Sequence, residues 1–157
     1  MGARYPVVLD LETKHTFRQF SDPADLGISV AGIFDYKSGE LMSFEEKALA
    51  DMFSILENAS IIVGFNIDSF DLPVLKRYYP GNTAELKTFD ILSDIKRELG
   101  RRLSLNDVVR ATLGRENKSI SIVRAGASVK GRCPSASNSC TTVLGVWRRD
   151  GGVVSRW

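Results

Sequence analysis

Residues 7–13 read Val-Val-Leu-Asp-Leu-Glu-Thr, a short apolar run that passes directly into two carboxylates. Branched apolar residues followed by polar ones predict a buried strand that ends near these acids. Asp10 and Glu12 are two residues apart, so on a strand both side chains leave the same face, with Cα atoms roughly 6.6 Å apart. This stretch predicts a strand that presents a pair of carboxylates at its carboxyl end.

The residues that follow alternate between strand and helix patterns. Two apolar runs, 26–35 and 41–44, are separated by turn residues and predict an antiparallel hairpin. Residues 61–65, Ile-Ile-Val-Gly-Phe, predict a parallel strand buried on both faces. The remaining predicted elements are helices at 45–58, about 69–79, 90–99 and 105–113, and a short strand at 86–89. This order predicts an α/β fold with a mixed sheet, an antiparallel hairpin plus parallel strands, flanked by helices.

Length and composition indicate an ordinary globular domain. A chain of 157 residues can bury a single core, and 43% hydrophobic with 25% charged residues excludes collagen-like, coiled-coil and wholly disordered classes. The sequence contains no apolar run of the roughly 18 residues that a membrane span requires, and no signal-peptide pattern at its start. We therefore expect a cytoplasmic domain that does not interact with membranes.

Charge divides the chain into two parts. Residues 1–117 contain 14 Lys and Arg against 18 Asp and Glu, whereas residues 118–157 contain seven basic residues and a single acid. After Gly114 neither strand nor helix periodicity persists. We expect a domain over residues 1–119 and a basic, irregular tail over 120–157. Cys133 and Cys140 lie in that tail without partner ligands and are interpreted as free thiols.

A third acid follows the parallel strand. Asp71 lies at the start of the next predicted helix, and ligands of open α/β sheets collect outside the carboxyl ends of the strands. Three converging acids would repel one another, so a bound metal is the simplest rationale for Asp10, Glu12 and Asp71 together. Taken separately, however, Asp10 and Glu12 fit solvated residues at a strand end, and Asp71 fits a residue that favours the helix dipole.

The ordered motifs resemble a known family. Residues 7–13 and 61–75 resemble the first two motifs of DEDD 3′-to-5′ exonucleases with a ribonuclease-H-like fold, most closely the bacterial YprB-type domains. Further matching segments extend the likeness over residues 5–119. The resemblance implies that Asp10, Glu12 and Asp71 hold two divalent cations, Mg²⁺ or Mn²⁺. These ions would activate a water for attack on the terminal phosphodiester at the 3′ end of single-stranded DNA or RNA.

The same resemblance implies other roles. Thr13, Asn66 and Phe70 would bind the substrate, although for Phe70 an aromatic residue of the core is an equal alternative. Asp90 matches a recurrent family acid, but we favour a helix N-cap. The single histidine, His15, is interpreted as an exposed bystander rather than a general base.

The likeness stops at Lys118-Ser119, where the family continues with a glycine-rich turn and a helix that carries Tyr-x-x-x-Asp or His-x-x-x-x-Asp. No Tyr or His follows Tyr79, and the last acid, Asp150, lies in Arg-Arg-Asp-Gly-Gly. We hypothesise that residues 120–157 replace the family's native segment, as a reading-frame shift would do. The expected function is an exonuclease domain of low or no activity. The alternative is a non-catalytic nucleic-acid-binding module whose basic tail contacts phosphate.

Overall fold

A computed structural model describes residues 3–114 of the chain. Its strands are β1 (Val7–Thr13), β2 (Ile28–Asp35), β3 (Glu40–Glu45), β4 (Ile62–Gly64) and β5 (Thr88–Asp90). They form one sheet in the order β3-β2-β1-β4-β5. The pairs β1–β2 and β2–β3 are antiparallel, whereas β1–β4 and β4–β5 are parallel. This mixed sheet, flanked by helices, confirms the predicted fold class.

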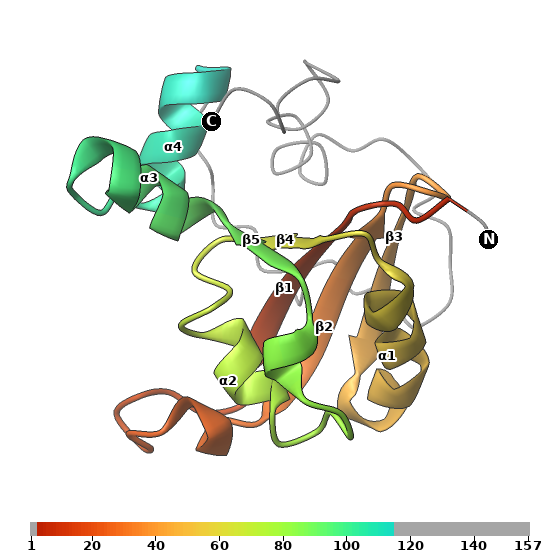
Figure 1. Cartoon of the computed structure of the whole chain (residues 1–157). Helices are drawn as coiled ribbons and strands as arrows, with labels where there is room; N and C mark the ends of the chain where they lie inside the picture. The colour runs from red at the N-terminus through yellow and green to blue at the C-terminus, as the bar shows by residue number, and fades with distance from the viewer. Residues whose placement is uncertain (1–2, 115–157) are drawn as a thin grey trace.

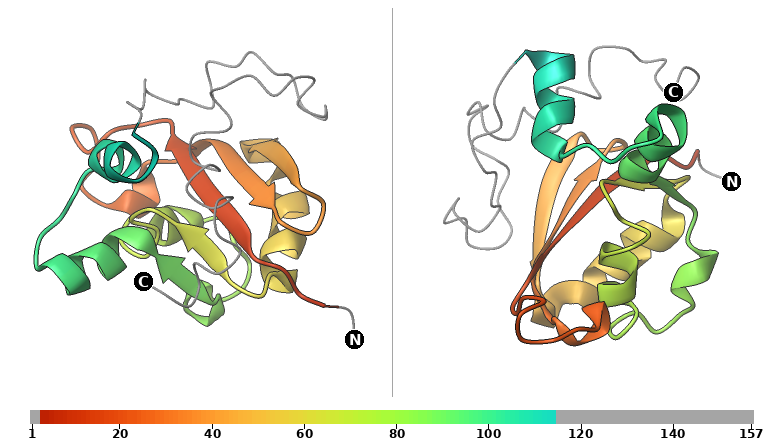
Figure 2. Two further views of the ribbon diagram at one scale, coloured as in Figure 1. Left: turned by 90° about the horizontal axis from the view of Figure 1, so that it is seen from above. Right: turned by 90° about the vertical axis from the view of Figure 1, so that its left-hand side faces the viewer.

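The α-helices are α1 (Leu49–Asn58), α2 (Asp71–Leu75), α3 (Ile91–Leu99) and α4 (Leu105–Leu113), and 3-10 turns occur at Pro23–Asp25, Glu46–Ala48 and Thr83–Glu85. Both α1 and α2 lie on the same face of the sheet, while α3 and α4 lie on the opposite side of the molecule from α1 (Figures 1 and 2). Helix α4 starts at a reciprocal cap between Ser104 and Asp107 and ends at Gly114, which adopts a left-handed conformation. Its bounds match those predicted from the sequence.

The core lies between the sheet and α1 and α2. Alternate residues of β1, namely Val7, Leu9 and Leu11, are buried in it together with residues of β2, α1 and α2. Because side chains alternate along a strand, Asp10 and Glu12 leave the opposite face of the sheet. The strand therefore anchors the core with one set of residues and presents its carboxylates with the other.

Several predicted bounds are wrong. The helix expected at 45–58 starts only at Leu49, because β3 continues to Glu45 and a 3-10 turn follows it. The helix expected to reach Tyr79 ends at Leu75, where the N–H groups of Tyr78 and Tyr79 both donate to the Leu75 carbonyl and close a turn. Its start, at Asp71 rather than near residue 69, carries no side-chain cap.

Two predictions concern parts of the chain beyond the core. Residues 120–157, with both cysteines, lie outside the described residues, so the boundary expected at 119 stays a prediction. Within residues 3–114, no helix combines the length and apolar content needed to cross a membrane.

Tyr78 connects the segment after α2 to the start of β2. The N–H of Ile28, a fully buried residue, donates to the Tyr78 hydroxyl at 3.2 Å. The same hydroxyl donates to Glu46 at 2.9 Å. Tyr79, the next residue, places its hydroxyl against the exposed Glu57 at 3.0 Å. These neighbouring tyrosines differ in whether their hydroxyl satisfies a buried backbone group.

We expect Tyr78→Phe to lower the free energy of unfolding by about 1 to 3 kcal/mol, because the buried Ile28 N–H loses its acceptor. The matched control, Tyr79→Phe, removes a bond to an exposed side chain and should cost no more than about 0.5 kcal/mol. Urea denaturation of the two variants measures the difference. Equal losses would show that the Ile28 bond does not contribute as described.

Candidate active site

Strand β1 extends well beyond its parallel neighbour. It pairs with β4 only at Val7 and Val8, although it continues to Thr13. The N–H of Val7 donates toward β4, and groups two residues apart on a strand face the same side, so the N–H of Leu11 faces the space where β4 has ended. Oδ1 of Asp71, from α2, accepts this N–H at 3.0 Å. Asp71 is thereby brought against the segment of β1 that carries the other two acids.

The two acids of β1 lie where the sequence predicted. Asp10 stands opposite Gly32 of β2, and Glu12 stands opposite Val30. Gly32 has no side chain and is itself buried. Asp10 reaches solvent and Glu12 is half-buried, whereas Asp71 is only 4% exposed.

Burial and mutual repulsion make two of these carboxyl groups weaker acids than an ordinary aspartate. Removal from water raises the pKa of Asp71 to about 8, with the charge of Asp10 adding to the rise and the Leu11 N–H opposing it. Partial exclusion of water raises the pKa of Asp10 to about 6, and the charge of Glu12 acts in the same direction. The charge of Asp10 therefore raises the pKa of Asp71, and the charge of Glu12 raises the pKa of Asp10, so the three acids interact electrostatically.

The three carboxylates are chemically suited to a divalent cation, but they do not converge on one position where an ion could bind. Carboxylate oxygens are preferred ligands of Mg²⁺ and Mn²⁺, and a cation would relieve the repulsion among the acids. As the side chains stand, no three Asp, Glu, His or Cys residues of the segment 3–114 come close enough together to hold an ion. Ion binding would require these side chains to draw closer.

Asp90 organises the turn between β4 and α2. It caps α3 by accepting the N–H groups of Leu92 and Ser93, which confirms the favoured interpretation. Its carboxylate also accepts the N–H of Asn66 at 2.8 Å and that of Asp68 at 3.4 Å. These bonds hold Asn66 in a left-handed conformation (φ 66°), which is uncommon for a residue other than glycine. Asp90 thus fixes the turn that leads from β4 to Asp71 at the start of α2.

The predicted substrate-binding residues have protein partners of their own. The Asn66 side chain accepts a bond from Arg102 at 3.4 Å, and the Thr13 hydroxyl donates to the carbonyl of His15 at 2.8 Å. Phe70 is half-buried and packs against the core, as its structural alternative predicted, and it also contacts the ring of Phe17 edge to face at 5.9 Å.

His15 differs from its prediction as an exposed residue. It is half-buried, and its ring contacts Phe20 edge to face at 5.0 Å. Sequence reasoning also missed Phe17, Phe20 and Arg102. Two aromatic residues in an otherwise polar loop were the available signal for the first pair, whereas nothing in the sequence links Arg102 to Asn66.

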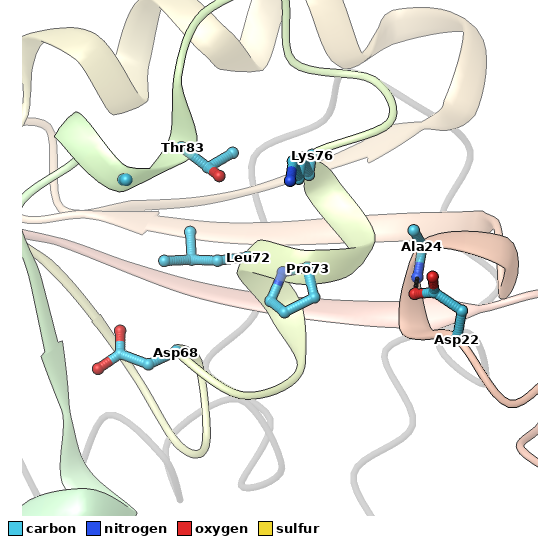
Figure 3. Close-up of a pocket in the computed structure, with 8 residues that line it drawn as sticks. Asp22, Ala24, Asp68, Leu72, Pro73, Lys76 and Thr83 are labelled. Atoms are coloured by element: carbon cyan, nitrogen blue, oxygen red, sulfur yellow. Dashed lines mark hydrogen bonds between the residues drawn. The ribbon is translucent and has the colours of Figure 1, made fainter.

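A surface pocket of about 410 Å³ lies beside the site rather than within it. Leu72 of α2 and Lys76, which directly follows this helix, line it on one side, and Asp22 and Ala24 line it on another (Figure 3). None of the three acids Asp10, Glu12 and Asp71 lines this pocket. The candidate site is therefore formed by the end of β1 and the start of α2, outside the pocket.

Comparison with known proteins identifies the superfamily. A family model described as the RNase H superfamily matches residues 7–128. No curated protein sequence matches the chain. Among solved structures, the chain is similar to the family B DNA polymerase from the hyperthermophilic archaeon Pyrobaculum calidifontis. That match has 18% identity and a TM-score of 0.37, and it covers 48% of this chain and 11% of the polymerase chain.

The raised pKa of Asp71 predicts how the stability of the metal-free protein depends on pH. The folded protein retains this proton up to about pH 8, whereas an unfolded Asp loses it near its ordinary value of 3.8. The folded state therefore binds more protons across this window, and the free energy of unfolding falls as pH rises, by at most about 1.4 kcal/mol per pH unit for one proton.

We expect Asp71→Asn to remove most of this fall between about pH 7 and about pH 8, above most of the titration of Asp10, whose pKa is about 6. The amide oxygen still accepts the Leu11 N–H, so the fold is retained. Chemical denaturation in metal-free buffer across this range measures the slope, with Asp51→Asn, an exposed residue of α1, as the control. A slope unchanged in Asp71→Asn would contradict the assignment.

The bonds of Asp90 predict a second stability effect. Asp90→Ala removes the cap of α3 and the acceptor of the Asn66 and Asp68 N–H groups, and should cost about 2 to 4 kcal/mol. Asp90→Asn keeps one acceptor oxygen and should cost markedly less. Thermal unfolding compares the two variants, and equal losses would mean that the charge of Asp90 matters rather than its hydrogen bonds.

Proposed function

The chain belongs to the ribonuclease H superfamily, and from this premise we propose that it is a metal-dependent 3′-to-5′ exonuclease domain of the DEDD kind acting on single-stranded nucleic acid. The observation that carries the proposal is the bond from Leu11 to Asp71. It brings an acid from α2 to the strand that bears Asp10 and Glu12, sixty positions earlier in the chain.

Asp10, Glu12 and Asp71 are the proposed ligands of two divalent ions, Mg²⁺ or Mn²⁺. Such a pair, when bound, activates a water for attack on the phosphodiester and stabilises the leaving 3′ oxygen. The protein's own contribution is to hold the ligands. Strand pairing with β2 fixes Asp10 and Glu12, while the Leu11 N–H engages Oδ1 of Asp71 and so orients that carboxylate. We assign Thr13, Asn66 and Phe70 to the wall that receives the terminal nucleotide.

We further propose that the activity is low. The resemblance that suggests the DEDD class includes a final Tyr/His and Asp motif, and the sequence contains neither Tyr nor His beyond Tyr79. A group that orients or deprotonates the attacking water typically contributes about 10² to 10⁴ in rate. In this proposal residues 1–119 form the nuclease domain and residues 120–157 supply no ligand.

Metal uptake distinguishes this function from a non-catalytic nucleic-acid-binding module. We expect calorimetric titration of the full chain with Mn²⁺ to give a saturable heat that Asp10→Asn abolishes. Asp51→Asn, which removes an exposed acid on α1, should leave the heat unchanged. Identical titrations for all three proteins would overturn the proposed site.

A turnover assay completes this test. Incubation of a 5′-labelled single-stranded oligonucleotide with Mn²⁺ should show slow shortening from the 3′ end, reduced to the level of a protein-free control in Asp10→Asn. DNA and RNA substrates tested in parallel establish which is cleaved. Shortening that persists unchanged in Asp10→Asn would remove these acids from the reaction, and rapid trimming would contradict the low activity.

A further inference from the structure

Two exposed aromatic rings lie on the loop between β1 and β2. Four large hydrophobic residues of the described segment 3–114 are strongly exposed, namely Tyr5, Phe17, Phe20 and Leu99. Phe17 is 56% exposed and Phe20 40%, and both belong to the loop spanning residues 14–27. Burial of an aromatic ring is energetically favourable. Two rings left in water on one loop therefore suggest a ligand that covers them.

The loop that carries these rings is held in place rather than loosely attached. At its base, the N–H groups of Lys14 and His15 donate to the carbonyls of Gly27 and Leu26, at 3.1 and 3.0 Å. Within the loop, Phe20 N–H donates to the Thr16 carbonyl at 3.2 Å. Two ion pairs, Lys14 with Glu46 and Asp25 with Arg77, connect the loop to the rest of the fold. A ligand would meet rings that are already positioned.

Ring contacts connect both phenylalanines to residues that lie close to the three acids in the sequence. Phe17 contacts Phe70 edge to face at 5.9 Å, and Phe70 directly precedes Asp71. Phe20 is supported by the ring of His15, three residues after Glu12. The loop and α2 are adjacent in the fold (Figure 1). Through Phe70, the N-cap of α2, the aromatic loop therefore contacts the start of the helix that carries Asp71.

We infer that Phe17 and Phe20 form a stacking platform for bases of a single-stranded nucleic acid whose 3′ end lies at the three acids, an inference that rests on the proposed function. Ring stacking suits this ligand because every base presents a π face, so binding tolerates any sequence. Arg18, between the two rings in the sequence and exposed, supplies a positive charge for phosphate. A protein partner would need a wider apolar surface than two rings.

The test compares the affinity of the protein for an oligonucleotide with bases and for one that lacks bases near its 3′ end. Fluorescence anisotropy of a labelled oligothymidylate, with Ca²⁺ in place of a catalytic ion, compares the full chain with the Phe17→Ala/Phe20→Ala variant. We expect the double substitution to weaken binding about 10- to 100-fold. Leu99→Ala, a residue of α3 that is also 56% exposed, is the matched control and should bind as the unaltered chain does. Phe17→Trp should retain binding.

An oligonucleotide with abasic nucleotides near its 3′ end isolates stacking from phosphate contacts. On this probe the unaltered chain should bind more weakly, and the double substitution should have no further effect. The inference is overturned if the double variant binds normally, if it loses equal affinity for both probes, or if the unaltered chain binds neither.

Mn²⁺ uptake separates the failure of this inference from the failure of the proposed function. Normal uptake with no effect of the phenylalanines removes the platform and leaves the metal site standing. Base-dependent binding without Mn²⁺ uptake supports the platform and removes the nuclease.

Discussion

The hydrogen bond from the Leu11 N–H to Asp71 is the interaction on which the candidate site depends. Strand β1 continues past the end of β4, so its backbone there needs a partner that the sheet does not provide. The carboxylate at the start of α2 supplies it. One consequence of completing this strand is that an acid distant in the sequence lies beside Asp10 and Glu12. The geometry of the sheet thereby brings the third acid to the strand that bears the other two.

The choice of a carboxylate at this position is costly. An amide oxygen would accept the same N–H without the charge that water exclusion and Asp10 disfavour, as the raised pKa of Asp71 shows. Local rules of stability are often broken at functional sites. We interpret Asp71 as a residue with two tasks, one structural and one chemical, of which only the first could be performed equally well by asparagine.

The turn from β4 to α2 illustrates where sequence reasoning succeeds and where it fails. Asp90 was interpreted as a helix cap because its place before an apolar helical pattern is a local signal. Its bonds to Asn66 and Asp68 join residues more than twenty positions apart, and no local pattern encodes them. Helix α2 was predicted too long because the pattern near Tyr78 reflects packing against β2 rather than helical continuation.

Elements whose signals are local can be predicted from the amino-acid sequence. These are the strand that bears Asp10 and Glu12, the hairpin, and the bounds of α4, because alternation, turn residues and capping act over a few positions. Three features follow only from the folded arrangement: which backbone group Oδ1 of Asp71 accepts, the repulsion between the acids, and the contact between Phe17 and Phe70. Those outcomes depend on where β4 stops relative to β1 and on how a loop closes over α2, which are distances through space between segments far apart in the chain.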